Sequence, residues 1–139
     1  MMRGQEREMK KLVRILIVDD EHAFRDILAI RLETKGLKVR TASKGEEALR
    51  ILAGDTFDVV ILDVLLPGID GPEVLRRIKE SHCRTEVIFL TRAVSVETAL
   101  KGMKSGAFDY LMKPCDLDVL LARIQRAEEK LETEELDAG

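Results

Sequence analysis

Short apolar runs alternate along the chain with longer stretches in which apolar residues recur every three or four positions. The runs lie at 13–18, 57–62, 86–90 and 107–112, and the more mixed segment 37–42 fits the same series. Runs of this length, bounded by polar residues, are typical of strands that are buried on both faces of a parallel sheet. The pattern therefore predicts five strands.

The stretches between these runs predict helices. In the first stretch Phe24, Ile27, Leu28 and Leu32 share one face, and Gly36 is a suitable residue to end the helix. Capping residues then mark where three further helices begin.

Two of these starts have the form of a capping box, Ser43 with Glu46 and Asp70 with Glu73, and Ser95 is a favourable N-cap. We predict that the three helices end near residues 54, 81 and 106.

The last two helices have continuous apolar stripes. The stripes consist of Val96, Ala99, Leu100 and Met103 in one helix and of Leu117, Leu120, Leu121, Ile124 and Leu131 in the helix that begins near Asp116. We expect Met103 and Met112 to pack in the core. Residues 132–139 have no apolar face, and we expect this acidic end to fray.

Strands and helices that alternate in this way imply a doubly wound α/β fold, with helices on both faces of a parallel sheet. Ligands bind at the carboxyl ends of the strands in such folds, so the residues just after each strand are the candidates for chemistry. They are Asp19, Asp20 and Glu21 after the first strand, Asp63 after the third, Thr91 after the fourth, and Lys113 with Pro114 after the fifth.

Acids, a hydroxyl and an ammonium at one edge favour a site for a divalent cation and a phosphoryl group. Mg²⁺ prefers oxygen ligands and suits a site with one or two carboxylates. Lys113 would add a second cation, Thr91 a hydrogen-bond donor, and Asp63 could be the nucleophile that becomes an acyl phosphate. A single acid after a strand, such as Asp20 or Asp63 considered alone, is more often a helix N-cap. The chain has neither GxxxxGK[ST] nor GxGxxG, which argues against a nucleotide site.

Length and charge narrow the class of protein. The chain has 139 residues, with 23 Lys and Arg against 26 Asp and Glu, which fits one domain without a nucleic-acid surface. Most of the imbalance is in the tails, at 1–14 and 127–139. No apolar run is long enough for a secretory signal or a membrane span, so we expect a cytoplasmic protein without a membrane surface. Cys83 and Cys115 are expected to be reduced thiols.

Four motifs together closely resemble the receiver domain of bacterial two-component response regulators. They are ILIVDDE (15–21), VVILDVLLPGIDG (59–71), VIFLT (87–91) and GAFDYLMKP (106–114). The resemblance covers about residues 12–130 and is greatest to receivers of nitrogen-regulator-type activators. It implies a flavodoxin-like fold with strand order 2-1-3-4-5 and five helices. We divide the chain into an N-terminal tail (1–11), the receiver domain (12–131) and an acidic C-terminal tail (132–139).

The resemblance also implies roles for individual residues. Asp63 would accept a phosphoryl group from a phosphohistidine, and Mg²⁺ or Mn²⁺ would be held by Asp20, Asp63 and the main-chain carbonyl of Leu65. Asp19 would act on the metal through water. The other roles are phosphoryl binding by Thr91 and Lys113, a switch in which Thr91 moves and Tyr110 turns inward, and a cis peptide bond at Lys113–Pro114.

The implied partner is a sensor histidine kinase or a phosphotransfer protein. The output surface would consist of the fourth helix, the fifth strand and the fifth helix, which could also form a homodimer, with Lys101, Lys104, Asp109 and Arg123 as candidate or merely solvated positions. The implied protein is no enzyme on outside substrates, since it catalyses only its own phosphorylation and dephosphorylation. Sequence leaves open whether the chain acts alone or is part of a longer regulator.

Several positions depart from the family pattern. Arg92 stands where a small residue is usual, so that its guanidinium either lies over the phosphoryl oxygens or turns to solvent. Val94 replaces a common glycine, which predicts a stiffer loop. Leu65 and Ala93 are apolar where polar side chains often position the hydrolytic water, and we therefore expect slow self-hydrolysis.

The sequence fits two other functions less well. A phosphate-independent interaction module with a receiver fold is disfavoured because Asp19, Asp20, Asp63, Thr91 and Lys113 are all present. An aspartyl-phosphate hydrolase typically needs a second acid two residues after the nucleophile. That position is Leu65.

Overall fold

The computed structural model describes residues 12–81, 84–92 and 95–138. Its strands are β1 (Arg14–Val18), β2 (Lys38–Ala42), β3 (Val59–Leu62), β4 (Glu86–Thr91) and β5 (Asp109–Met112). Its helices are α2 (His22–Thr34), α3 (Gly45–Gly54), α4 (Gly71–Ser81), α5 (Val96–Lys104) and α6 (Leu117–Ala138). The five predicted strands and five predicted helices are thus confirmed.

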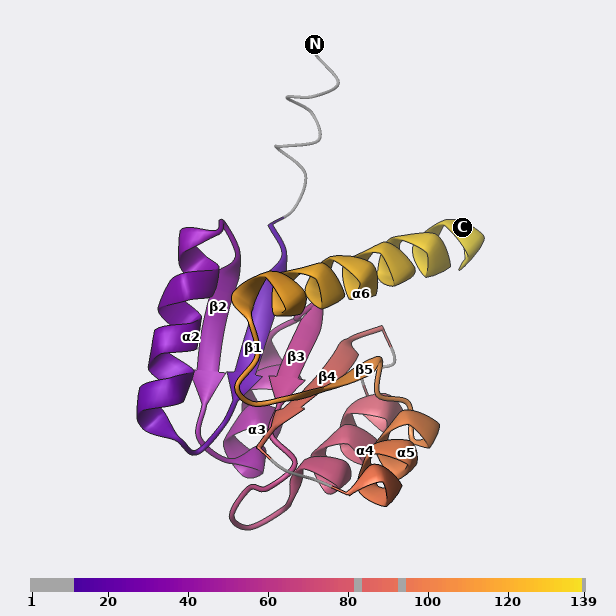
Figure 1. The fold of residues 1–139 in the computed structure, drawn as a ribbon. Helices are drawn as coiled ribbons and strands as arrows, with labels where there is room; N and C mark the ends of the chain where they lie inside the picture. The colour runs from indigo at the N-terminus through magenta and orange to yellow at the C-terminus, as the bar shows by residue number, and fades with distance from the viewer. Residues whose placement is uncertain (1–11, 82–83, 93–94, 139) are drawn as a thin grey trace.

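The strands form one parallel sheet in the order β2-β1-β3-β4-β5, which confirms the predicted fold class. Helices α2 and α6 cover one face of the sheet, and α3, α4 and α5 cover the other (Figure 1). All five strands run in the same direction, so their carboxyl ends lie at a single edge, which we call the carboxyl edge. The opposite edge is called the amino edge.

Each face of the sheet has its own apolar core, and β1 shows why the strands read as continuous apolar runs. Ile15 and Ile17 pack with residues of α2 and α6, whereas Leu16 and Val18 pack with residues of α3 and α4. Successive side chains of a strand point to opposite faces, so a strand covered on both sides has no polar positions to alternate.

The predicted helix ends are mostly confirmed. Asp70 accepts a hydrogen bond from the backbone N–H of Glu73 at 3.0 Å, and Ser95 accepts one from Thr98 at 3.2 Å. Gly36 and Gly106 follow helix ends with φ of 93° and 106°, a conformation that favours glycine.

The capping box predicted at Ser43 is wrong in its partner. Helix α3 has Lys44 as its N-cap, and the carboxylate that returns to the Ser43 backbone N–H, at 2.7 Å, belongs to Glu47. Because the helix begins one residue later than predicted, the carboxylate that can return to Ser43 is also one residue further along the chain. Glu46 instead accepts a hydrogen bond from the Ile69 backbone N–H at 3.0 Å.

Two further predictions are overturned at the C-terminal side. Helix α6 does not fray after Leu131 but continues to Ala138 (Figure 1), supported by residues of high helix propensity and the Lys130–Glu134 ion pair at 3.7 Å. Met103 and Met112 are not core residues, since they are 43% and 54% exposed. Helix α5 buries Gly102, next to the Phe89 ring, and leaves its apolar stripe facing outward.

Two smaller expectations concern the cysteines and membrane-spanning helices. Cys115 is a free thiol, and Cys83 lies outside the described residues. Within the described part of the chain, none of the helices is both long enough and apolar enough to cross a membrane.

Candidate functional site

Four loops bring the predicted site residues together at the carboxyl edge. Asp19 follows β1, Asp63 follows β3, and Lys113 follows β5, while Thr91 is the last residue of β4. Parallel pairing of neighbouring strands aligns these ends, since Val18 pairs with Leu62 and Thr91 with Met112. The sheet topology alone is therefore sufficient to assemble the site.

Three carboxylates form the acidic part of this site. One carboxylate oxygen each from Asp19, Asp20 and Asp63 can be chosen so that all lie within 4.8 Å of one another. Asp19 and Asp63 are buried, whereas Asp20 is exposed. Like charges at this separation repel, and the repulsion is stronger where water is excluded.

Lys113 lies among these acids and is 6% exposed. Its ammonium is 2.7 Å from Asp19 Oδ2, 2.8 Å from Glu21 Oε1 and 3.4 Å from Asp63 Oδ2. It also lies 4.3 Å from the centre of the Phe24 ring, which adds a cation–π contact. One buried ammonium is therefore shared by three acids, and its contact with Asp63 is the longest of the three.

The pKa shifts at the site follow from burial and from these contacts. Burial raises the pKa of Asp19 above its usual value, against the opposing effect of the hydrogen bonds from Lys113 and from the Glu21 backbone. Burial alone would lower the pKa of Lys113, but its hydrogen bonds to Asp19 and Glu21 and the nearby acidic charges raise it overall. The ammonium thus stays protonated, and the Asp19 carboxylate is ionised at an energetic cost.

Asp63 has two hydrogen-bond donors on one carboxylate oxygen. The Thr91 hydroxyl donates to Oδ1 at 2.7 Å, and the Leu65 backbone N–H donates to the same atom at 3.1 Å. The other oxygen faces Lys113. Donors on both oxygens balance the negative charge of this carboxylate, and they lie close to where the oxygens of a transferred group would need donors.

Tyr110 lies beneath the site with its hydroxyl buried and without a hydrogen-bond partner among the described residues. Its ring packs against Phe89, with 5.9 Å between the ring centres. Burial raises the pKa of Tyr110, and the charge of Asp63 adds to the effect. Tyr110 is thus already turned inward while Thr91 donates to Asp63.

The loop after Asp63 is held by close backbone contacts. The Gly71 N–H donates to the Val64 carbonyl at 2.9 Å, and a Cβ at Gly71 would overlap the Asp63 carbonyl oxygen. Glu46 of α3 holds the far side of this loop through the Ile69 N–H. The Leu65 side chain is exposed, and the Lys113–Pro114 peptide bond is cis, as the family resemblance implies.

Glu21 has a larger part in the site than the sequence indicated. Sequence reasoning placed it at the carboxyl edge without a role, yet it bridges Lys113 at 2.8 Å and Arg92 at 2.7 Å. The Arg92 side chain is 73% exposed, as in the second of the two predicted orientations, but its guanidinium also pairs with Glu21. The run of three acids at 19–21 was the available signal. Ala93 and Val94 lie outside the described residues.

The acidic residues fit a hard divalent cation. The carboxylate oxygens of Asp19, Asp20 and Asp63 lie within 4.8 Å of one another, and the two buried acids, Asp19 and Asp63, share the ammonium of Lys113. Such an excess of carboxylate oxygen over basic groups suits Mg²⁺, which prefers oxygen ligands.

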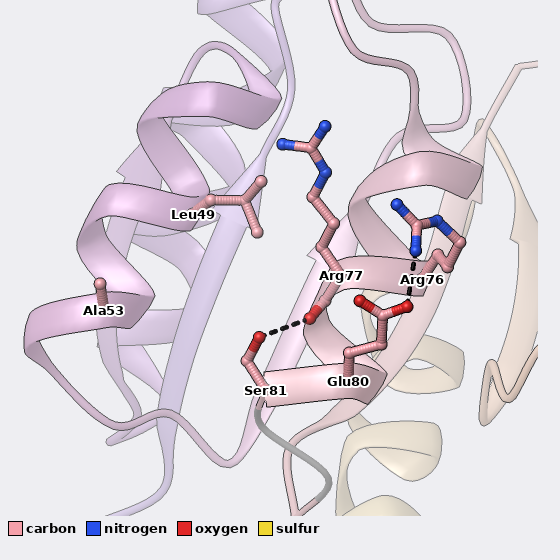
Figure 2. Close-up of a pocket in the computed structure, with 6 residues that line it drawn as sticks. All are labelled: Leu49, Ala53, Arg76, Arg77, Glu80 and Ser81. Carbon is pink, nitrogen blue, oxygen red and sulfur yellow. Dashed lines mark hydrogen bonds and ion pairs between the residues drawn. The ribbon is translucent and has the colours of Figure 1, made fainter.

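A separate groove of about 690 Å³ lies between α3 and α4, away from the carboxyl edge. Figure 2 shows Leu49 and Ala53 on one wall and Arg76, Arg77 and Glu80 on the other. Arg76 pairs with Glu80 at 2.6 Å, and both arginines pair with Glu73. The arginines are therefore neutralised within α4, and the groove is no anion site.

The output surface expected from the sequence is partly neutralised as well. Asp109 of β5 and Arg123 of α6 pair with each other at 3.1 Å, so they are not independent surface charges. Leu100, Met103 and Met112 are exposed on α5 and β5. The apolar side chains are thus the more prominent feature of this surface.

Comparison with known proteins agrees with this geometry. Residues 15–125 match the family described as the response regulator receiver domain. The chain is 40% identical over 119 residues to the regulatory protein AtoC of Escherichia coli K12, covering 86% of this chain and 26% of AtoC. It is 40% identical over 125 residues to the uncharacterized transcriptional regulatory protein YkoG of Bacillus subtilis, covering 90% of this chain and 55% of YkoG.

A solved structure gives the same result for the fold. The CheY-like receiver domain protein from Methanospirillum hungatei JF-1 superposes with a TM-score of 0.86 at 31% identity, covering 89% of this chain and 99% of that one. The curated relatives are longer regulators, of which this chain spans about a quarter to a half. The matched residues include the whole carboxyl edge, and the chain therefore belongs to the receiver-domain family of two-component response regulators.

Proposed function

We propose that Asp63 is the phosphoacceptor of this receiver. The observation that supports this best is the set of donors around its carboxylate: Thr91 and the Leu65 N–H on Oδ1, and Lys113 near Oδ2. A nucleophilic carboxylate surrounded by donors is what phosphoryl transfer requires, because charge on the transferred oxygens must be balanced.

The transfer can be written with all bonds accounted for. An Asp63 carboxylate oxygen attacks the phosphorus of a phosphohistidine on the partner, so that an O–P bond forms and the N–P bond breaks. The electron pair of the broken bond stays on the imidazole nitrogen, which takes up a proton. Lys113 and Thr91 hydrogen-bond to the phosphoryl oxygens, and Lys113 leaves its present partners to do so.

Asp20, Asp63 and the main-chain carbonyl of Leu65 are proposed to hold Mg²⁺ or Mn²⁺, with Asp19 acting through water. The convergence of the three carboxylates supports this set, and the hydrogen bond from the Leu65 N–H to Asp63 holds Leu65 next to them. When bound, the ion offsets the carboxylate repulsion and the negative charge of the phosphoryl oxygens.

Thr91 and Tyr110 are proposed as the switch. Thr91 would transfer its hydrogen bond from Asp63 to a phosphoryl oxygen, and Tyr110, whose buried hydroxyl has no hydrogen-bond partner among the described residues, would respond to that movement. The signal would reach a surface of α5, β5 and α6, where exposed apolar residues offer a contact for an output partner or a second copy of the chain.

A sensor histidine kinase or phosphotransfer protein is proposed as the phosphodonor, and the cytoplasm as the compartment. A groove of about 270 Å³ beside Lys113 is lined mainly by apolar residues of α2 and of the segment that leads into α6, and Ile27 is exposed at its rim. Apolar surface next to the phosphoacceptor would let a partner dock while its histidine reaches Asp63. The chain is not proposed to act on outside substrates or to bind nucleic acid.

The test uses acetyl phosphate as a small phosphodonor. Wild-type protein incubated with acetyl phosphate and Mg²⁺ should gain the mass of one phosphoryl group, and hydroxylamine should remove it, as expected for an acyl phosphate. The gain should be absent in Asp63→Asn and in wild type with excess EDTA. Wild type without any gain would favour a phosphate-independent interaction module instead.

A further inference from the structure

The Arg92–Glu21 ion pair crosses the carboxyl edge above Lys113. It joins residues 71 positions apart in the chain, one from the loop after β4 and the other from the loop after β1, with 2.7 Å between Arg92 Nη2 and Glu21 Oε2. Nothing in the proposed transfer step uses either residue. Glu21 nevertheless contacts the ammonium that the step depends on, and Arg92 is linked to that ammonium through Glu21.

The two oxygens of Glu21 have different partners. Oε2 pairs with Arg92, and Oε1 accepts a hydrogen bond from Lys113 at 2.8 Å. The Glu21 backbone N–H also donates to Asp19 Oδ1 at 2.9 Å, which fixes the start of α2 beside the site. The Glu21 side chain is therefore fixed between a buried cation and an exposed one.

These contacts compete with Asp63 for Lys113. The ammonium is 2.8 Å from Glu21 and 3.4 Å from Asp63, so Glu21 has the closer contact. To bind a phosphoryl group on Asp63, Lys113 must exchange its bond to Glu21 for one to a phosphoryl oxygen. A Glu21 carboxylate without a second cation would resist this exchange and would stand unpaired beside the phosphoryl charge.

Arg92 supplies that second cation. Its side chain is 73% exposed, and its guanidinium contacts the site through Glu21. The Glu21 carboxylate thus accepts from two cations, from Lys113 at Oε1 and from Arg92 at Oε2. With a divalent cation present, the four acids of the site would be balanced in charge by that ion together with Lys113 and Arg92.

We propose that Glu21 is a positioning residue for Lys113, and that Arg92, acting through Glu21, lets Lys113 move to the phosphoryl group. This inference rests on the proposed phosphorylation of Asp63. Loss of Arg92 leaves Glu21 with Lys113 alone and slows phosphorylation. Loss of the Glu21 charge frees Lys113 and makes Arg92 unimportant.

The test is a double-mutant cycle read by the rate of phosphorylation with acetyl phosphate and Mg²⁺. Arg92→Ala should lower the rate roughly threefold or more, and Glu21→Gln should raise it. In the Glu21→Gln background, Arg92→Ala should change the rate by less than about twofold. Arg92→Lys should restore the wild-type rate, and Arg76→Ala, which removes another exposed arginine ion pair, should leave it unchanged.

A second readout reports Lys113 directly. The ¹⁵N-detected ammonium signal of Lys113 in the unphosphorylated protein should shift in Glu21→Gln and in Arg92→Ala but not in Arg76→Ala. Thermal unfolding of each variant shows whether it is folded, so that a rate is compared only between folded proteins.

Three results would overturn the proposal. An equal effect of Arg92→Ala in both backgrounds would mean that Arg92 acts without Glu21. A faster rate in Arg92→Ala would mean that its side chain blocks the donor, and an unchanged rate in Glu21→Gln would mean that Glu21 does not restrain Lys113. Wild-type protein that gains no phosphoryl group would instead overturn the proposed function on which the cycle depends.

Discussion

The two edges of the sheet both contain buried acids, but the acids are paired differently. At the amino edge Glu86 lies between two lysines, 3.2 Å from Lys79 and 2.8 Å from Lys130. Asp55, a half-buried acid at the same edge, pairs with Arg14 at 2.6 Å and Arg40 at 3.8 Å. Each of these acids has two bases.

At the carboxyl edge the ratio is reversed, since Asp19, Glu21 and Asp63 share Lys113, and among the described residues Arg92 adds a base to Glu21 alone. Paired charges at the amino edge hold α4 and α6 to the sheet. The excess of carboxylates over bases at the carboxyl edge lowers the stability of the fold. Such an excess is typical of functional sites, where the charges are needed to bind a ligand. The number of bases per acid therefore distinguishes charged residues that stabilise the fold from charged residues that bind a ligand.

The largest expected effect on stability comes from a backbone contact at the carboxyl edge. Gly71→Ala should destabilise the fold by about 3 kcal/mol, because its Cβ would overlap the Asp63 carbonyl oxygen and the Val64 backbone. Urea unfolding measures the change. Gly54→Ala is the matched control, since a Cβ there meets nothing within 4 Å. Equal effects of the two variants would show that the loop after Asp63 is not tightly packed.

The next largest effect is expected at the amino edge. Glu86→Gln should lower the free energy of unfolding by about 2 kcal/mol, because the buried carboxylate accepts from two lysines that then lose their partner. The lysines can reach water, which limits the loss. Glu97→Gln, which removes an exposed pair with Lys101 at 4.0 Å, should leave the urea midpoint unchanged. A neutral Glu86→Gln would remove the distinction between the edges.

A smaller effect with opposite signs is expected in the pH dependence of stability. The pKa of Asp19 is raised by burial, so its ionised form costs stability above that pKa, and the cost disappears as the pH falls through it. The pKa of Asp55 is lowered by its hydrogen bond from Arg14, so its contribution is present above the usual 3.8 and is lost as the pH falls through the lowered value.

Urea unfolding measured from about pH 3 to about pH 7 tests the direction of both pH effects, because the usual carboxyl pKa lies near the lower end of this range. Asp19→Asn should raise stability at neutral pH, with a gain that shrinks on acidification. Asp55→Asn should lower stability at neutral pH, with a loss that shrinks as the pH falls below the usual carboxyl pKa. Shifts of the same sign in both variants would contradict the comparison.

The sequence predicted the fold well because burial on both faces leaves a clear record in β1, β3 and β4. It predicted the residues at the carboxyl edge for the same reason, since topology alone places them there. Contacts between side chains of different loops were harder to predict from the sequence. The Arg92–Glu21 pair joins positions 71 apart, and the cap of α3 depends on where the helix begins.

Exposed elements were also harder to predict than buried ones. The apolar residues of α5 recur with the same period as those of a helix that packs on the core. Helix α5 instead packs on the sheet at Gly102, and its apolar residues face outward. Helix α6 extends beyond its apolar face because Glu and Leu favour helix without packing. Periodicity records which residues share a face, and it does not record what covers that face.

The central claim is that the surplus charge of the carboxyl edge is neutralised by a divalent cation. The most direct test is the free energy of unfolding of wild type and Asp20→Asn, each measured in EDTA and in Mg²⁺. Without metal, Asp20→Asn should be the more stable protein by about 1 kcal/mol, because one of three converging carboxylates is neutralised. Mg²⁺ should stabilise wild type and have a much smaller effect on Asp20→Asn. If Mg²⁺ stabilises both equally, or neither, the claim is contradicted.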